Sequence, residues 1–138
     1  MSVPVNARSH GKLEACVKAR ELCAYTIKIT SNPKIFKPEY QQALTDRIVE
    51  AAIEVHTLSW SANNVLVNSA EDMQRRLEYQ DRAADACNIL LSLIEIAKPV
   101  FHLATKRVTY WSGFAIETRK LLRAWREADR KRYSARFK

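Results

Sequence analysis

The chain has 138 residues, a mass of 15.9 kDa and a formal net charge of +8 at pH 7. Its hydrophobic fraction of 47% is too high for a disordered protein, and its two glycines and four prolines are too few for a turn-rich all-β fold or a glycine-rich phosphate loop. This length suits one domain built around one hydrophobic core.

The sequence shows no pattern of a secreted or membrane protein. Its opening residues lack the apolar region of a signal peptide. The longest strongly apolar stretch, Ala86–Ile94, is about half of the roughly 20 residues that span a bilayer. Cys16, Cys23 and Cys87 form no CxxC motif, and on one helix the first two would lie about 10.5 Å apart along the axis, too far for a disulfide. We therefore expect a cytoplasmic protein with buried, reduced thiols and no membrane partner.

The first predicted element is a helix over Gly11–Thr30. Its apolar side chains recur at helical spacing and predict a buried face: Leu13, Val17, Ala24 and Ile27. Residues 31–33 end the helix, because the ring of Pro33 disfavours helical backbone at the residue before it. A short connector then leads to Pro38, a residue that suits the first turn of the next helix.

The second predicted helix runs from Pro38 to Val67. Its apolar residues follow an unbroken 4-3 spacing that is typical of a helix packed along one seam. These seam residues are Leu44, Ile48, Ala51, Val55, Leu58, Ala62 and Val65. Asn68 and Ser69 interrupt the pattern, and Ser69 with Asp72 three residues later predicts an N-cap for the third helix.

The third predicted helix covers Ala70–Ala97 and repeats the same spacing. Its seam residues are Met73, Leu77, Gln80, Ala84, Cys87, Leu91 and Ile94. Pro99 weakens the helix, so Val100–Ala104 is predicted to be an irregular turn. Thr105 is the predicted N-cap of a fourth helix over Lys106–Tyr133, whose packing side is expected to hold Trp111, Phe114, Thr118, Leu121, Leu122 and Trp125.

Four long helical patterns joined by short connections predict an all-α, antiparallel four-helix bundle. We expect a single domain over residues 1–138, with an ordered core of about 11–133. The broad apolar faces of the helices also favour a homo-oligomer, since one thin bundle buries little surface.

The positive charge is concentrated at the end of the chain. Residues 119–138 contain nine basic and two acidic residues, whereas residues 1–118 are nearly neutral. At about 100° per residue, Arg119, Arg123, Arg126 and Arg130 fall within a sector of about 60°, away from the packing side. A ladder of guanidinium groups predicts a surface for phosphates, with RNA or DNA as the polyanion. The alternative is a solvated helix end whose cations complement the helix macrodipole.

The residue patterns of common enzymes are missing from the sequence. His10, His56 and His102 lie on three different segments, and no GxSxG, Walker or GxGxxG motif is present. Asp81 and Asp85 share a helix face near Arg82, where we expect them to be solvated. These patterns favour a protein that is not an enzyme and holds no metal or other cofactor; an enzyme with an unrecognised site is the remaining alternative.

Three stretches of the chain carry a family resemblance: Leu44–Val67, Arg76–Ala97, and Phe101–Tyr133 with its KR-x-x-YW, R-x-LL-x-x-W and D-R-x-R-Y elements. Over roughly residues 36–133 the chain resembles the accessory variability determinant (Avd) proteins of diversity-generating retroelements. A related branch, encoded in intervening sequences of bacterial large-subunit ribosomal RNA genes, ends its second helix with Ala-Glu-Gly, which the region of Asn63 and Asn64 lacks.

The resemblance implies a basic, non-catalytic protein whose four-helix subunits form a pentameric barrel. It implies two kinds of partner, the reverse transcriptase of the same element and the template RNA with its cDNA, which together support mutagenic cDNA synthesis. The candidate nucleic-acid-binding residues are Arg119, Lys120, Arg123, Arg126, Arg130, Lys131 and Arg132, with Lys106 and Arg107 in second rank. The alternative function is a protein–protein interaction scaffold without a nucleic-acid role.

Overall fold

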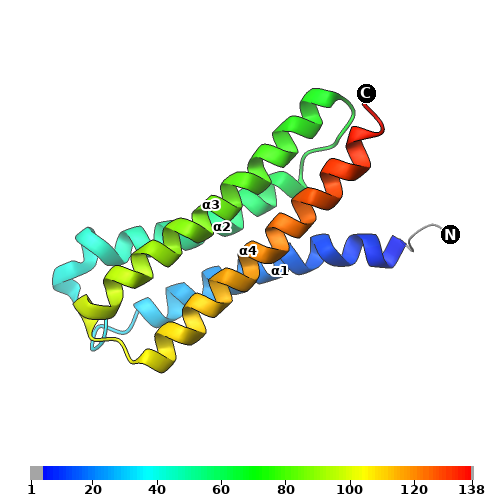
Figure 1. The fold of residues 1–138 in the computed structure, drawn as a ribbon. Helices are drawn as coiled ribbons and strands as arrows, with labels where there is room; N and C mark the ends of the chain where they lie inside the picture. The colour runs from blue at the N-terminus through cyan, green and yellow to red at the C-terminus, as the bar shows by residue number, and fades with distance from the viewer. Residues whose placement is uncertain (1–4, 138) are drawn as a thin grey trace.

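The computed structural model describes the backbone of residues 5–137 and the side chains of residues 14–137. Within this part the chain forms four α-helices and no strand: α1 (Val5–Thr30), α2 (Asp46–Asn63), α3 (Ala70–Phe101) and α4 (Thr105–Ser134). Helix α2 packs against α1 and α3, and α4 packs against the same two helices (Figure 1). The prediction of an all-α, four-helix fold is confirmed.

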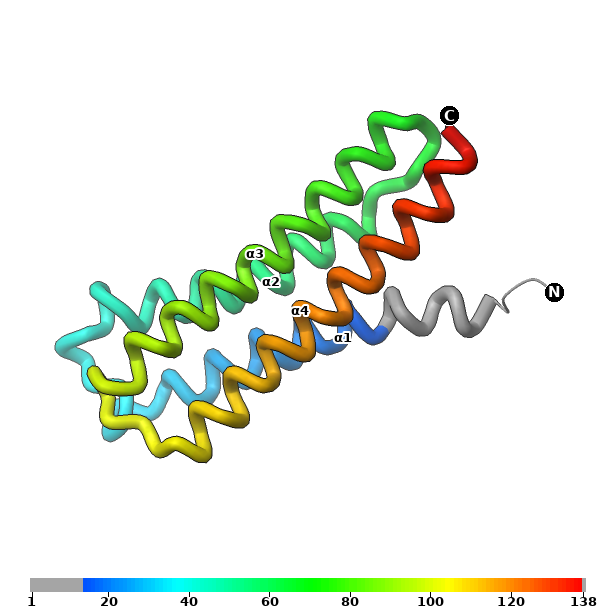
Figure 2. Tube along the Cα trace, viewed as in Figure 1, coloured from blue at the N-terminus to red at the C-terminus, as the bar shows by residue number. Residues whose placement is uncertain are grey.

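Different helix ends and connections lie at the two ends of the molecule. The end of α4 and the loop between α2 and α3 lie at one end, and the α1–α2 and α3–α4 connections lie at the other (Figure 2). Helix α1 starts at Val5, before the predicted Gly11. Residues 1–4, which the expected ordered core left out, lie outside the described residues.

The core lies between the predicted seams of α2 and α3. Every predicted seam residue of these segments is buried or half-buried, as is each residue of the predicted packing side of α4. Burying one of the leucine, isoleucine, valine or phenylalanine side chains contributes roughly 1.5–3 kcal/mol to stability relative to leaving it exposed. Trp111 is fully buried, and its Nε1 donates a hydrogen bond of 3.0 Å to Thr26 Oγ1 of α1. This bond sets the rotation of α4 against α1.

The predicted buried face of α1 is wrong. Ala24 and Ile27 are exposed and Val17 is only half-buried, while Leu13 lies outside the described side chains. The face that packs is instead formed by Ala15, Ala19, Leu22, Cys23, Thr26 and Thr30. Three of these residues are alanine or cysteine, whose small side chains let neighbouring helices approach closely. Apolar periodicity alone could not select this face, because threonine hydroxyls occupy part of it.

The second helix is shorter than predicted at both ends. A 3₁₀-helix (η1, Pro38–Tyr40) and a π-helix (η2, Gln41–Thr45) replace its first turns. Gln41 Nε2 donates to Asp46 Oδ1 at 2.7 Å, a spacing of five residues that matches the π register. At the other end, the Asn64 side chain donates to the Trp60 carbonyl at 3.0 Å, and α2 stops at Asn63. Val65 is still buried, but it lies in the loop.

Helix α3 begins as predicted and ends later. Ser69 is its N-cap, and its hydroxyl accepts a 3.1 Å bond from the Asp72 N–H. The helix then continues through Pro99 to Phe101, so the predicted irregular turn over Val100–Ala104 is wrong for its first two residues, and residues 102–104 alone connect α3 to α4. Phe101 is buried against Phe36, with ring centroids 4.8 Å apart, and this packing outweighs the hydrogen bond lost at proline. His102, in the left-handed conformation at φ 53°, then ends the helix.

Helix α4 begins one residue before the prediction, with Ala104 rather than Thr105 at the N-cap. No side chain caps it. Leu103 before the cap is buried, and Val108 packs against the same core. These are the two positions of a hydrophobic staple, which orients the chain entering the helix. The predicted side-chain cap at Thr105 is therefore wrong, because apolar packing positions this helix start.

Candidate nucleic-acid interface

The C-terminal half of α4 holds the candidate residues of first rank, but it does not present them as one unpartnered ladder. Two of the four arginines of the ladder donate hydrogen bonds to side chains of α3. Arg119 Nη1 donates to Asn88 Oδ1 at 2.6 Å, and Arg126 Nε donates to Asp81 Oδ1 at 3.1 Å. A helical projection of α4 alone could not predict these contacts, because α3 supplies the acceptors.

Arg130 also has a carboxylate beside it. Its Nη2 donates to Glu127 Oε1 at 2.6 Å, one turn back along α4. This hydrogen bond lowers the pKa of Glu127 below its ordinary value, and the charges of neighbouring cations act in the same direction. Solvent screens exposed pairs of this kind, so water or a phosphate can replace the carboxylate at little cost.

Four basic residues at this end of the chain extend into solvent. Lys120, Arg123, Lys131 and Arg136 are exposed, and within the described residues none of their side chains has a hydrogen bond or an ion pair. We call these four the exposed basic set. Lys120, Arg123 and Lys131 are spread along about 16 Å of the α4 axis, and Arg136 follows the end of the helix, a distribution that suits a flexible or extended polyanion better than a small anion.

Arg132 belongs to a buried network that sequence reasoning missed. Asp129 is fully buried and accepts from Arg76 Nε at 2.7 Å, from Gln80 Nε2 at 2.7 Å and from Arg132 Nη2 at 2.6 Å. The signal was present in the spacing, because Asp129 follows the core residue Trp125 by four positions.

The Arg76 side chain closes this end of the bundle. Its Nη1 donates to the carbonyls of Ala62 and Val65, both at 3.4 Å, where α2 ends. Its guanidinium also lies 5.3 Å from the Trp125 ring centroid. Arg76 of α3 thereby connects α2 and α4 at the end of the bundle where the exposed basic set lies.

The candidates of second rank lie at the other end of α4. Lys106 is exposed and Arg107 is half-buried, close to the start of the helix. Arg107 and Arg119 are about 18 Å apart along the helix axis. The structure therefore does not bring Lys106 and Arg107 together with the first-rank group.

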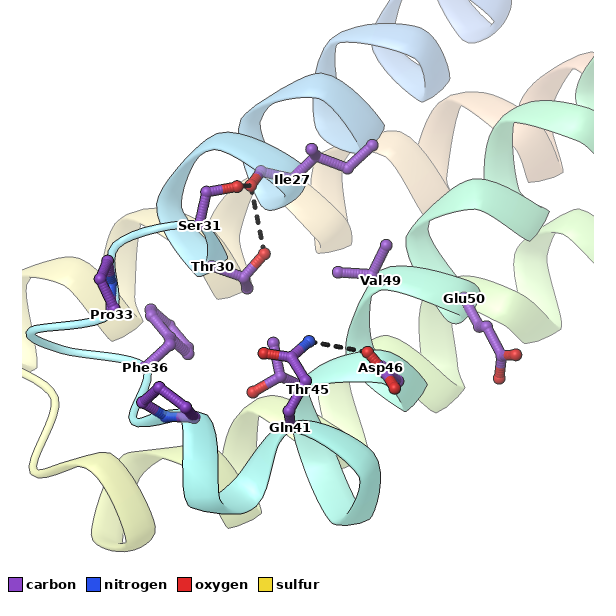
Figure 3. Close-up of a pocket in the computed structure, with 11 residues that line it drawn as sticks. Ile27, Thr30, Ser31, Pro33, Phe36, Gln41, Thr45, Asp46, Val49 and Glu50 are labelled. Carbon is purple, nitrogen blue, oxygen red and sulfur yellow. Dashed lines mark hydrogen bonds between the residues drawn. The ribbon is translucent and has the colours of Figure 1, made fainter.

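A pocket of about 570 Å³ opens where α1 ends and α2 begins (Figure 3). Ile27, Phe36 and Val49 supply apolar walls, and Asp46 and Glu50 supply carboxylates. The Ser31 hydroxyl donates a hydrogen bond of 2.6 Å to the Ile27 carbonyl. Neither histidine nor cysteine lines this pocket.

The cysteines of the core are poorly suited to nucleophilic chemistry. Burial raises the pKa of the Cys87 thiol to about 12, and the charges of Arg119 and Arg123 oppose this rise only in part. Burial also raises the pKa of Cys23. Both thiols are therefore protonated near neutral pH, whereas the thiolate is the nucleophile.

The described residues show neither a cluster of metal-ligating side chains nor a helix suited to a bilayer. No three histidine, cysteine, aspartate or glutamate side chains gather there as metal ligands would. None of the helices in this part is long and apolar enough to cross a bilayer.

The exposed basic set offers cationic side chains of the type that hold phosphate groups. The buried Arg76–Asp129 pair joins α3 to α4 beneath it. Comparison of the chain with models of protein families, with curated proteins and with solved structures yields no significant match.

Proposed function

We propose that this chain binds nucleic acid through the exposed basic set at the end of the chain. The observation that carries the proposal is the solvent exposure of Lys120, Arg123 and Lys131 on the C-terminal half of α4 and of Arg136 just beyond it. Lysine and arginine side chains that neutralise phosphates release condensed counterions, and this release drives non-specific binding. Such contacts position a nucleic acid without reading its sequence.

We further propose that the chain is a non-catalytic accessory protein of a reverse transcriptase in a diversity-generating retroelement. The resemblance of residues 36–133 to accessory variability determinant proteins supports this role. In this proposal antiparallel four-helix subunits assemble into a pentameric ring in the cytoplasm. The ring brings several basic helix ends together, so that weak phosphate contacts add through avidity and hold template RNA and cDNA near the polymerase.

The phosphate-binding role is tested by removing the four charges. The variant K120Q/R123Q/K131Q/R136Q changes only exposed side chains, so we expect it to fold. If all four contact phosphates, the slope of log K against log salt concentration on single-stranded RNA falls in magnitude by roughly 3. Fluorescence anisotropy with a labelled RNA over a salt series measures this slope.

The matched control is R20Q/K34Q/K37Q/R47Q, which also removes four exposed positive charges, from α1, the connector and α2. We expect this control to retain the salt slope. Equal losses in both variants would show that net charge alone drives binding, and an unchanged slope in the α4 variant would contradict the proposed interface.

The accessory role predicts a reverse transcriptase gene beside the gene for this chain, and that enzyme provides the test. The tagged chain is expected to co-purify with it as a defined multimer, measured by light scattering, and to raise the yield of cDNA from the template RNA. A multimer that binds neither the enzyme nor the RNA would contradict this role.

The alternative of a protein-interaction scaffold has its own supporting observation. Trp60 on α2 is 61% exposed, and Ile89 and Ile96 on α3 are about half exposed. Apolar side chains of this size at the surface favour contact with another protein. Binding that is insensitive to salt and is not competed by RNA would favour the scaffold.

A further inference from the structure

A second surface of α4 holds a cluster of aromatic rings at the groove with α1. The ring centroid of Tyr110 lies 5.2 Å from that of Tyr25 and 6.1 Å from that of Phe114. The interplanar angles are 63° and 79°, so neither neighbour stacks face to face on Tyr110. Tyr110 is 60% exposed.

The position of Tyr110 follows from the packing of its neighbour. Trp111 is buried and hydrogen-bonded to Thr26, which fixes the rotation of α4. The preceding residue is turned by about 100° and therefore lies at the edge of the groove rather than in the core. Tyr110 is thus held in place by rigid helices while most of its ring contacts solvent.

Positive charge surrounds the cluster on the side of the bundle end. Lys28 follows Tyr25 by one turn, and Lys106 precedes Tyr110 by one turn; both are exposed. Burial raises the pKa of the Tyr25 hydroxyl, and the charge of nearby Arg107 opposes that rise. On the other side of the rings, Lys18 Nζ lies 5.7 Å from the Phe114 ring centroid. An exposed aromatic ring flanked by cations is the combination that binds unpaired bases and their phosphates.

The cluster is aligned with part of the exposed basic set. At about 100° per residue, Lys106, Tyr110, Lys120 and Lys131 fall within a sector of about 80° on α4. All four are exposed, and Lys120 is about 15 Å from Tyr110 along the axis. The acidic Glu117 also lies in this sector. A strand following this side of α4 would meet Lys106 and Tyr110, then the carboxylate of Glu117, and then Lys120 and Lys131.

We propose that Tyr110 and Tyr25, with Lys28, Lys106 and Arg107, form a stacking platform for unpaired bases of single-stranded nucleic acid. This inference rests on the proposed nucleic-acid function and deepens it, because it makes single strands the preferred ligand. Every base offers a ring face, so stacking is tolerant of sequence. A duplex keeps its bases stacked on one another and cannot use the platform.

Exposure of an aromatic side chain is not sufficient for this role. Trp60 is as exposed as Tyr110, but its ring neighbour is His56 at 6.1 Å, and the residues within one turn of it on α2 include no lysine or arginine. Trp60→Ala therefore provides a matched control for the loss of a large exposed ring.

The test compares a labelled uridine homopolymer with an RNA duplex of the same length. Tyr110→Ala is expected to weaken binding of the single strand about tenfold and to leave duplex binding and the salt slope unchanged. Tyr110→Phe keeps the ring and is expected to retain binding, and Trp60→Ala is expected to bind like the unchanged chain. Circular dichroism and light scattering check that fold and oligomeric state persist.

Crosslinking supplies a second measurement that needs no substitution. Irradiation of the unchanged chain with 5-bromouridine RNA is expected to attach the RNA to peptides containing Tyr110 or Tyr25. An unchanged affinity of Tyr110→Ala for the single strand, an equal loss on the duplex, or crosslinks confined to other peptides would overturn the platform. If the unchanged chain binds neither RNA, the proposed function itself fails; if it binds both equally well and depends only on the exposed basic set, only the platform fails.

Discussion

Two arginine–aspartate pairs join α3 to α4, and they differ in burial rather than in chemistry. Arg76 and Asp129 are 2.7 Å apart, with side chains only 7% and 0% exposed. Arg126 and Asp81 are 3.1 Å apart, with side chains 32% and 56% exposed. The buried pair cannot exchange its partner for water, whereas the exposed pair can. One arginine therefore supports the fold, and the other remains available to a phosphate.

The largest effect is expected from breaking the buried pair. Asp129→Leu leaves the Arg76 guanidinium buried without its carboxylate and should lower the free energy of unfolding by about 3–5 kcal/mol. Urea unfolding followed by circular dichroism measures the loss. Asp81→Leu is the control at the exposed pair, and a similar loss there would contradict the contrast between the two pairs.

Removing both members of the buried pair sharpens the same point. In Arg76→Met/Asp129→Leu no buried charge is left unpaired, so we expect most of the stability lost in Asp129→Leu to return. The unfolding free energies of the two single variants and the double variant form a cycle that isolates the pair. Additive losses would show that Arg76 acts mainly through the carbonyls of Ala62 and Val65.

The stability of the chain at alkaline pH tests whether the Cys87 thiol of α3 is buried. The pKa of Cys87 rises from 9.0 to about 12 in the folded chain, so above pH 9 the unfolded chain loses a proton that the folded chain keeps. Stability should therefore fall as pH rises, by about 1 kcal/mol between pH 9 and pH 10 from this group. Cys87→Ala is expected to remove this part of the pH dependence; an identical slope in both chains would argue against a buried thiol.

The smallest effect on stability is expected at the exposed pair. Asp81→Asn should change the free energy of unfolding by less than about 1 kcal/mol, because solvent screens the pair. The same change removes a carboxylate that competes with phosphate for Arg126, so RNA affinity should rise slightly. Anisotropy titration measures the gain, and an unchanged RNA affinity would place Arg126 outside the interface.

The candidate site was only partly predictable from the sequence. The charge excess at residues 119–138 is a property of composition and needed no fold. The neighbours of Arg119 and Arg126 come from α3, more than thirty positions away in the chain, and no helical projection of α4 contains them. For the same reason the contact of Tyr110 with Tyr25 could not be predicted, whereas helical spacing correctly placed Trp111 on the packing side.

The sequence by itself determined the number of helices, the seams of α2 and α3, the Ser69 cap and the packing side of α4. Hydrophobic spacing and local hydrogen bonding decide these features within one or two turns of chain. Only the tertiary structure decided which face of α1 is buried, that α3 continues through Pro99, and that Asp129 is a core residue. Each depends on groups from another helix or connector, whose packing and hydrogen bonds outweigh the local preference of the residue.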